Sequence, residues 1–237
     1  MVIGRINLGR DFEEDFERTI TTSFVDVSKI HGRDQDKETL VSKLFSESST
    51  LGGIQTISIV GAGGMGKTTL AQLVFNEFLA GEMKEQFQVR IWICVSDPFD
   101  EIKIARAILE SINRSAPNLS ELETLLQCIR ESISGKKFFL VLDDVWIEED
   151  SKWIPLKVCL KSGASGSRIL VTTRKTRVAE IMGTTYTHSL EPLSESYCWS
   201  VLSQIALQDR EEADCEMLKE VGPEIAKKRL SLYCIEH

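Results

Sequence analysis

The stretch Gly61-Ala62-Gly63-Gly64-Met65-Gly66-Lys67-Thr68-Thr69, "GAGGMGKTT", fits the pattern G-x-x-x-x-G-K-[ST] and decides the fold. It follows the short apolar run 56–60, "TISIV", and precedes apolar residues at helical spacing from Leu70 to Phe78. Glycines let consecutive backbone N–H groups turn inward around an anion, and the start of a helix adds partial positive charge. The stretch therefore predicts a loop that grips phosphate.

This pattern is that of a P-loop, and it assigns roles to the residues that end it. We expect Lys67 to reach the β and γ phosphates of a nucleotide and the Thr68 hydroxyl to ligate Mg²⁺. The alternative is a merely flexible glycine turn. The strand before the loop and the helix after it disfavour that alternative, because they are the context in which a P-loop occurs.

An acidic pair ends another buried run, 137–144, "KFFLVLDD". A magnesium nucleotide needs a carboxylate near the phosphates, at the C-terminal end of a strand. We expect Asp143 to hold Mg²⁺ directly or through water, and Asp144 to orient an attacking water as general base. Alternatively, the two acids simply end the strand and start a turn.

Two further segments carry candidate site residues. Arg174 follows the run 167–173, "SRILVTT", where a cation can sense or neutralise the charge of a γ-phosphate. A plain surface arginine is the alternative. Upstream, "IHGRD" places Ile30, Gly32 and Arg33 before the first expected helix, and by itself this short motif indicates no more than a turn.

Strands and helices alternate along most of the chain. We expect strands at 56–60, 89–95, 137–144 and 167–173, and helices over 35–45, from Leu70 towards Gly81, over 102–112, and over 122–133 with Ser120 and Glu123 as its cap. Continuous apolar runs indicate strands buried on both faces. The prediction is an α/β fold: a P-loop NTPase with a doubly wound parallel sheet flanked by helices.

The domain organisation follows from the same pattern. Residues 1–29 are expected to be a linker or the tail of an upstream domain, and residues 30–190 the P-loop nucleotide-binding domain. Helical spacing returns from Trp199 to Ala206 and from Met217 to Ile225. Residues 191–237 are therefore expected to be a partial helical subdomain.

Composition restricts the partners and the compartment. The net charge of -8 and the pI near 5.1 argue against nucleic acid as a partner, and the short cluster 227–229, "KKR", suits a solvated helix end. The six cysteines show no metal or redox spacing and are expected to be reduced. No signal peptide or run of about 18 apolar residues occurs, so we expect a cytoplasmic chain without an integral membrane segment.

Five motifs in order resemble one family. "IHGRDQD", "GAGGMGKTT", "RIWICVSDPFD", "KKFFLVLDDVW" and "GSRILVTTRKTRVA" are similar to the NB-ARC domain of plant coiled-coil NBS-LRR disease resistance proteins, over roughly residues 21–229. The resemblance implies a signal-transduction ATPase of the STAND class. In that class ADP holds an inactive state, and exchange for ATP permits self-association and defence signalling.

The resemblance also implies site residues. The phosphates and Mg²⁺ would be held by Gly61, Gly63, Gly64, Gly66, Lys67, Thr68 and Thr69. Asp143 and Asp144 would be the Walker B pair and Arg174 the arginine sensor, while Ile30, Gly32 and Arg33 would lie against adenine and ribose. The family's Gly-Leu-Pro-Leu motif is not found after "EIAKK", which predicts a C-terminally truncated form that binds nucleotide weakly and does not lock with ADP.

The favoured function is an ADP/ATP-binding switch module of a plant immune receptor, at most a slow Mg-dependent ATPase, with a second receptor copy or host proteins as partners. One alternative is a dedicated ATP hydrolase; steady turnover abolished by Asp144→Ala would favour it. Another is a non-catalytic decoy or interaction fragment; partner binding that survives Lys67→Ala would favour that.

Overall fold

Five parallel strands form the sheet of this protein, in the order β2-β3-β4-β1-β5. The computed structural model describes residues 20–45, 53–79, 85–95 and 98–206. The strands are β1 (Gln55–Val60), β2 (Val89–Cys94), β3 (Phe138–Val145), β4 (Arg168–Thr173) and β5 (Tyr186–Ser189). Strands β4 and β5 lie on either side of β1, so the connection from β4 to β5 passes across β1. The loop after β1 therefore lies at a switch point of the sheet.

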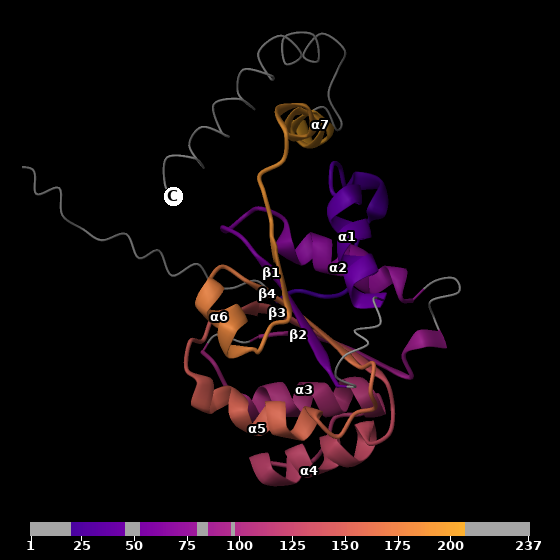
Figure 1. The fold of residues 1–237 in the computed structure, drawn as a ribbon, viewed down its shortest axis with the longest axis vertical. Coiled ribbons are helices and arrows are strands. Elements are labelled where there is room, and N and C mark those ends of the chain that lie inside the picture. The colour runs from indigo at the N-terminus through magenta and orange to yellow at the C-terminus, as the bar shows by residue number, and fades with distance from the viewer. Residues whose placement is uncertain (1–19, 46–52, 80–84, 96–97, 207–237) are drawn as a thin grey trace, which may run out of the picture.

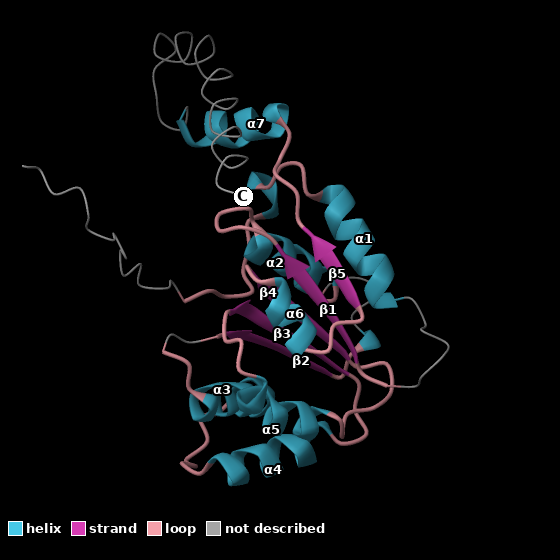
Figure 2. Ribbon diagram, turned by 60° about the vertical axis from the view of Figure 1, so that its left-hand side comes forward, coloured by secondary structure: helices cyan, strands magenta, loops and turns pink. Residues whose placement is uncertain are grey.

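Helices cover both faces of the sheet (Figures 1 and 2). The helices are α1 (Asp34–Phe45), α2 (Lys67–Glu77), α3 (Glu101–Asn113), α4 (Leu122–Ile133), α5 (Asp150–Leu160), α6 (Thr176–Ile181) and α7 (Glu195–Ala206), and a 3₁₀ turn, η1, spans Val27–Lys29. Helices α1 and α2 pack on one face with an aromatic cluster, and α3 to α6 pack on the other with mostly aliphatic residues. Helix α7 lies beyond the sheet, at the opposite end of the molecule from α4.

The central strands are buried as their apolar runs predict. Strands β3 and β4 are buried along almost their whole length, whereas the short edge strand β5 alternates between half-buried and exposed residues. Helices on both faces exclude water from the central strands, so the α/β doubly wound prediction is confirmed.

Two helices and one strand were not predicted, each for a physical reason. Helix α5 carries Pro155 in its interior, which removes an N–H and obscures the helical pattern. Strand β5 is short and half-polar, and α6 has six residues, too few for periodicity to show.

One predicted helix cap and one predicted helix end were wrong. Helix α4 begins after Glu121 and has no side-chain hydrogen bond at its cap, so Ser120 and Glu123 do not form the expected capping box. Helix α2 already ends at Glu77 rather than near Gly81. The expected helix at 217–225, the basic cluster 227–229 and residues 1–19 lie outside the described residues.

The described cysteines, Cys94, Cys128, Cys159 and Cys198, are free thiols. Among the described residues, no helix is both long enough and apolar enough to cross a membrane.

Candidate functional site

The candidate site lies where four parallel strands end. The glycine loop follows β1, the acidic pair lies in the last three residues of β3, Arg174 follows β4, and Glu191 comes soon after β5. Because the strands are parallel and β1 lies between β4 and β5, these segments meet at one edge of the sheet. Ligands of open α/β sheets bind in this crevice at the carboxyl ends of the strands.

Backbone conformation at the loop requires glycine at two positions. Gly64 has φ of 75° and Gly66, which precedes α2, has φ of 87°, both in the left-handed region that side chains disfavour. A Cβ at Gly63 would lie 3.3 Å from Nη1 of Arg174, so the guanidinium lies close against the loop. The Gly61 N–H is not directed into the loop. It donates to the Thr173 carbonyl and extends the pairing of β1 with β4 by one hydrogen bond.

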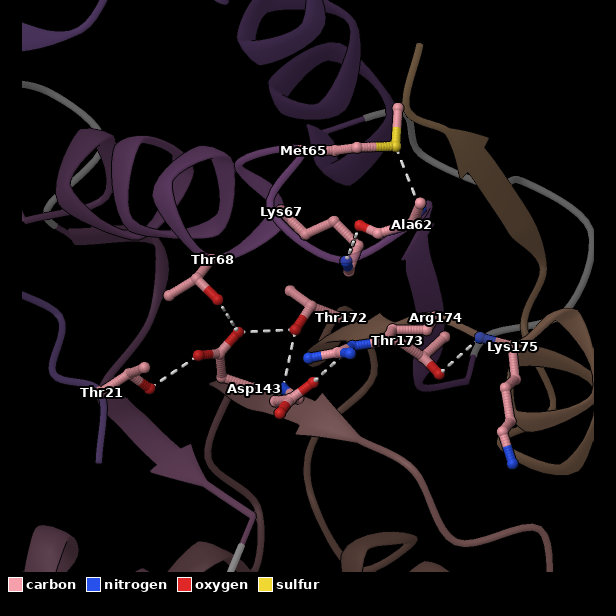
Figure 3. Close-up of polar contacts among 11 residues, drawn as sticks. Thr21, Ala62, Met65, Lys67, Thr68, Asp143, Thr172, Thr173, Arg174 and Lys175 are labelled. Atoms are coloured by element: carbon pink, nitrogen blue, oxygen red, sulfur yellow. Dashed lines mark hydrogen bonds and ion pairs between the residues drawn. The ribbon is translucent and has the colours of Figure 1, made fainter. Parts of the chain in front are cut away.

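Lys67 is the first residue of α2 and is 7% exposed. Its ammonium donates to the Ala62 carbonyl at 2.7 Å, folding the side chain over the loop (Figure 3). Burial and the Arg174 cation lower the pKa of Lys67, while Asp144 and Asp143 act in the opposite direction. Two cations and two carboxylates therefore share one electrostatic environment, and an added anion would stabilise the charged ammonium.

Asp143 is fully buried and its carboxylate accepts three hydroxyl hydrogen bonds (Figure 3). Oδ1 accepts from Thr68 at 3.0 Å and from Thr172 at 2.6 Å. Oδ2 accepts from Thr21 at 2.6 Å. A buried carboxylate needs such donors or a cation, and here they come from α2, β4 and the segment before η1.

These groups fit a magnesium ion bound together with phosphate. The Thr68 hydroxyl and the Asp143 carboxylate are hard oxygen donors within 3.0 Å of each other, as Mg²⁺ prefers. No group of three or more His, Cys, Asp or Glu side chains among the described residues could hold a metal on its own. The protein donors therefore suit a cation that keeps water and phosphate oxygens in its shell.

Asp144 has a strained backbone at the end of β3. Its φ of 54° lies in the left-handed region, uncommon for a residue other than glycine, and the pairing of β3 with β4 shifts register between Leu142 and Val145. Its N–H donates to the Thr172 hydroxyl at 2.8 Å, and its carboxylate lies 4.0 Å from Nε of Arg174. The strain breaks the strand alternation that would direct neighbouring side chains to opposite faces.

Arg33 holds three segments together at the edge of the site. The side chain is buried, and its guanidinium donates to the carbonyls of Met65 and Glu191 and pairs with Asp36. In this structure Arg33 therefore fixes the glycine loop relative to β5.

The other two residues of that motif lie beside Arg33. Gly32 has φ of 70°, and a Cβ there would lie 2.5 Å from the Tyr197 ring, so glycine permits the packing of α7. Ile30 is half-buried and its N–H donates to Val27. Thr69 lies in the first turn of α2 and is half-buried.

Thr172, Met65 and Thr21 belong to the site and were not anticipated. The Thr172 hydroxyl is hydrogen-bonded to the Asp143 carboxylate and to the Asp144 N–H. The sequence feature that could have indicated it is the pair of threonines, 172 and 173, at the end of an otherwise apolar strand. The Met65 sulfur accepts from the Ala62 N–H at 3.0 Å. Nothing local in the sequence links Thr21 to Asp143, because 122 positions separate them.

Comparison with known proteins identifies relatives of this chain. Disease resistance protein RGA2 of Solanum bulbocastanum is 40% identical over 218 residues, covering 91% of this chain and 22% of the relative. Disease resistance protein RPP13 of Arabidopsis thaliana is 32% identical over 206 residues, covering 83% and 24%. The chain thus spans about a fifth to a quarter of the length of these relatives.

Solved structures show the same fold. The crystal structure of Cdc6p from Pyrobaculum aerophilum superimposes with a TM-score of 0.59 at 20% identity, covering 79% of this chain and 52% of that one. The Aeropyrum pernix ORC1 protein, solved in complex with DNA, gives 0.58 at 14% identity, covering 83% and 60%. Residues 33–212 match the NB-ARC domain family, to which this chain belongs.

Proposed function

We propose that this chain binds ADP or ATP with Mg²⁺ as the nucleotide switch of a plant intracellular immune receptor. The observation that carries the proposal is the convergence of Lys67, Asp143, Asp144 and Arg174 on the glycine loop at the switch point of the sheet. Family membership and homology to disease resistance proteins support it. On this proposal the nucleotide stabilises one of two shapes, and hydrolysis resets the shape.

Each residue has a part in holding the oligophosphate. Loop N–H groups and the N-terminus of α2 would face the phosphates, and the Lys67 ammonium would exchange the Ala62 carbonyl for a phosphate oxygen. The Thr68 hydroxyl and Asp143 would hold Mg²⁺, which neutralises phosphate charge when bound. Arg174, beside Gly63, would contact the terminal phosphate, so its position would differ between the ADP and ATP states.

Slow hydrolysis fits this arrangement. Asp144 would orient an attacking water, and its strained backbone holds the carboxylate near Arg174. Ile30, Gly32 and Arg33 would lie near the base and ribose. The Arg33 guanidinium would keep only some of its hydrogen bonds to the carbonyls of Met65 and Glu191 when it contacts the nucleotide. We place the nucleotide-binding domain at 30–190 and a helical subdomain after it, in a cytoplasmic protein whose partners are receptor copies or host proteins.

Calorimetric titration of the purified chain with ADP, ATP and GTP, with and without Mg²⁺, tests the proposal. We expect one adenine-selective site that is strengthened by Mg²⁺. Lys67→Ala should weaken binding about a hundredfold, because two or more charge-assisted hydrogen bonds to phosphate are lost. Thr124→Ala, an exposed change on α4, is the control. Equal affinity of wild type and Lys67→Ala would contradict the proposal.

A further inference from the structure

The segment 20–23, before η1, lies against the site, and we name it the strap. Its residues alternate: Thr21 and Ser23 are half-buried, whereas Ile20 and Thr22 are exposed. One side of the segment therefore lies on the protein. The strap is thus oriented, with the Thr21 side chain directed inward.

Two side chains of α2 hold the strap by its backbone. The Gln72 amide donates to the Thr22 carbonyl at 2.5 Å, and the Asn76 amide donates to the Ser23 carbonyl at 2.7 Å. Gln72 and Asn76 are four residues apart and therefore lie on the same face of the helix. Because α2 begins with Lys67 and Thr68, the strap is fixed to the helix that carries the phosphate-binding residues.

The inward side chain of the strap completes the environment of Asp143. Thr68 and Thr172 both donate to Oδ1, and the Thr21 hydroxyl donates to Oδ2 at 2.6 Å (Figure 3). With donors on both oxygens, the carboxylate is fixed in rotation about its Cβ–Cγ bond. Thr21 thereby keeps Oδ1 directed at Thr68, the hydroxyl beside which a cation would bind.

We propose that Thr21 is a positioning residue of the nucleotide site and that occupancy of the magnesium position orders the strap. This inference rests on the proposed function. Outer hydrogen-bond partners that orient metal ligands commonly change metal affinity by about 10–100-fold when removed. By reciprocity, a cation that tightens the Asp143 network also tightens the strap.

Magnesium titration of the ADP-bound full chain tests the positioning role. We expect Thr21→Val to raise the Mg²⁺ concentration at half-saturation about tenfold while ADP affinity in EDTA is unchanged. Thr21→Ser, which keeps the hydroxyl, should restore Mg²⁺ affinity. Thr22→Val is the matched control, because its exposed side chain makes the same chemical change on the outward face. Unchanged or tighter Mg²⁺ binding in Thr21→Val would overturn the proposal.

Amide hydrogen exchange tests the coupling without relying on turnover. We expect Mg²⁺ added to ADP-bound protein to slow exchange of amides in 20–26, and Thr21→Val to abolish that protection. The double substitution Gln72→Ala and Asn76→Ala should also reduce it, because the strap loses its attachment to α2. Equal protection in wild type and Thr21→Val would overturn the coupling.

The experiments distinguish a failure of the proposed function from a failure of the proposed role of Thr21. If wild-type protein binds no nucleotide under any condition, the proposed function fails. If wild type binds Mg²⁺ and ADP while Thr21→Val behaves identically, the proposed function stands and the role of Thr21 is wrong. Circular dichroism of each variant confirms that it is folded before either conclusion is drawn.

Discussion

The carboxyl end of the sheet and the apolar layer between the sheet and α3–α5 are built in opposite ways. The end of the sheet buries Lys67 and Asp143, which are charged groups satisfied by hydroxyls and carbonyls. The apolar layer buries residues such as Ile108, Leu125 and Leu142 with no exposed surface. One region concentrates charge, and the other excludes water.

This difference separates stability from binding. Burying a charge costs free energy even when it is hydrogen-bonded, whereas each large aliphatic side chain buried contributes about 1.5–3 kcal/mol. We therefore expect the apolar layer to supply most of the folding free energy and the carboxyl end to supply most of the nucleotide affinity. Substitutions in the two regions should have separable effects.

The largest expected effect is on stability. Ile108 lies on α3 and is fully buried. Ile108→Ala should lower the free energy of unfolding by about 2–5 kcal/mol, since it leaves a cavity in the layer. Urea denaturation followed by circular dichroism measures the loss, and Glu110→Ala on the exposed face of α3 is the control. A loss below about 1 kcal/mol would place the stabilising core elsewhere.

Lys67→Ala is the converse test. Its nucleotide-free unfolding free energy should stay within about 1 kcal/mol of wild type, because removing a desolvated cation offsets the lost hydrogen bond to Ala62. Together with the loss of binding, this would separate function from fold. A loss comparable with that of Ile108→Ala would show that the carboxyl end also carries stability.

A smaller effect is expected at Asp144. Its left-handed backbone disfavours any residue with a Cβ, and alanine lacks the polar side chain that eases the conformation. Asp144→Ala should therefore be less stable than Asp144→Gly by about 1 kcal/mol. Chemical denaturation compares the two variants, and both should lose ATP turnover. Equal stabilities would show that the backbone at this position relaxes without cost.

The last prediction leaves the fold unchanged and concerns a thiol in the apolar layer. Burial raises the pKa of Cys159 to about 11 from 9.0, and the thiol donates to the Leu126 carbonyl. At pH 8 the thiolate fraction, and with it alkylation by iodoacetamide, should be about a hundredfold lower in native protein than in urea. Mass spectrometry measures the Cys159 rate. Similar rates in the two states would mean that the layer admits water.

The same contrast explains what could be predicted from the sequence. Lys67 was predicted from the glycine-loop pattern, and Asp143 and Arg174 because each comes at the end of a buried apolar run. The structure brings the three together because the carboxyl ends of parallel strands lie at the same end of the sheet. Helix α5 was missed because Pro155, which lies inside it, is a residue that disfavours a helix interior in sequence patterns. Thr21 and Thr172 were missed because their importance comes from contacts with Asp143 across 122 and 29 positions, which local patterns do not encode.

Arg33 shows a different limit of prediction from sequence. Its motif led us to expect contact with adenine and ribose, and that remains a prediction. The structure adds that its guanidinium bonds the backbone of the glycine loop and of Glu191. A residue can serve the loop and the base together, and a sequence pattern does not separate these roles.

Hydrogen exchange of the full chain with and without ADP and Mg²⁺ tests the central claim most directly. We predict slower exchange in 61–70, at the end of β3 and in 172–175, with no change in α4. Protection that is confined to α4 and α5, or that is absent from the glycine loop, would contradict the account.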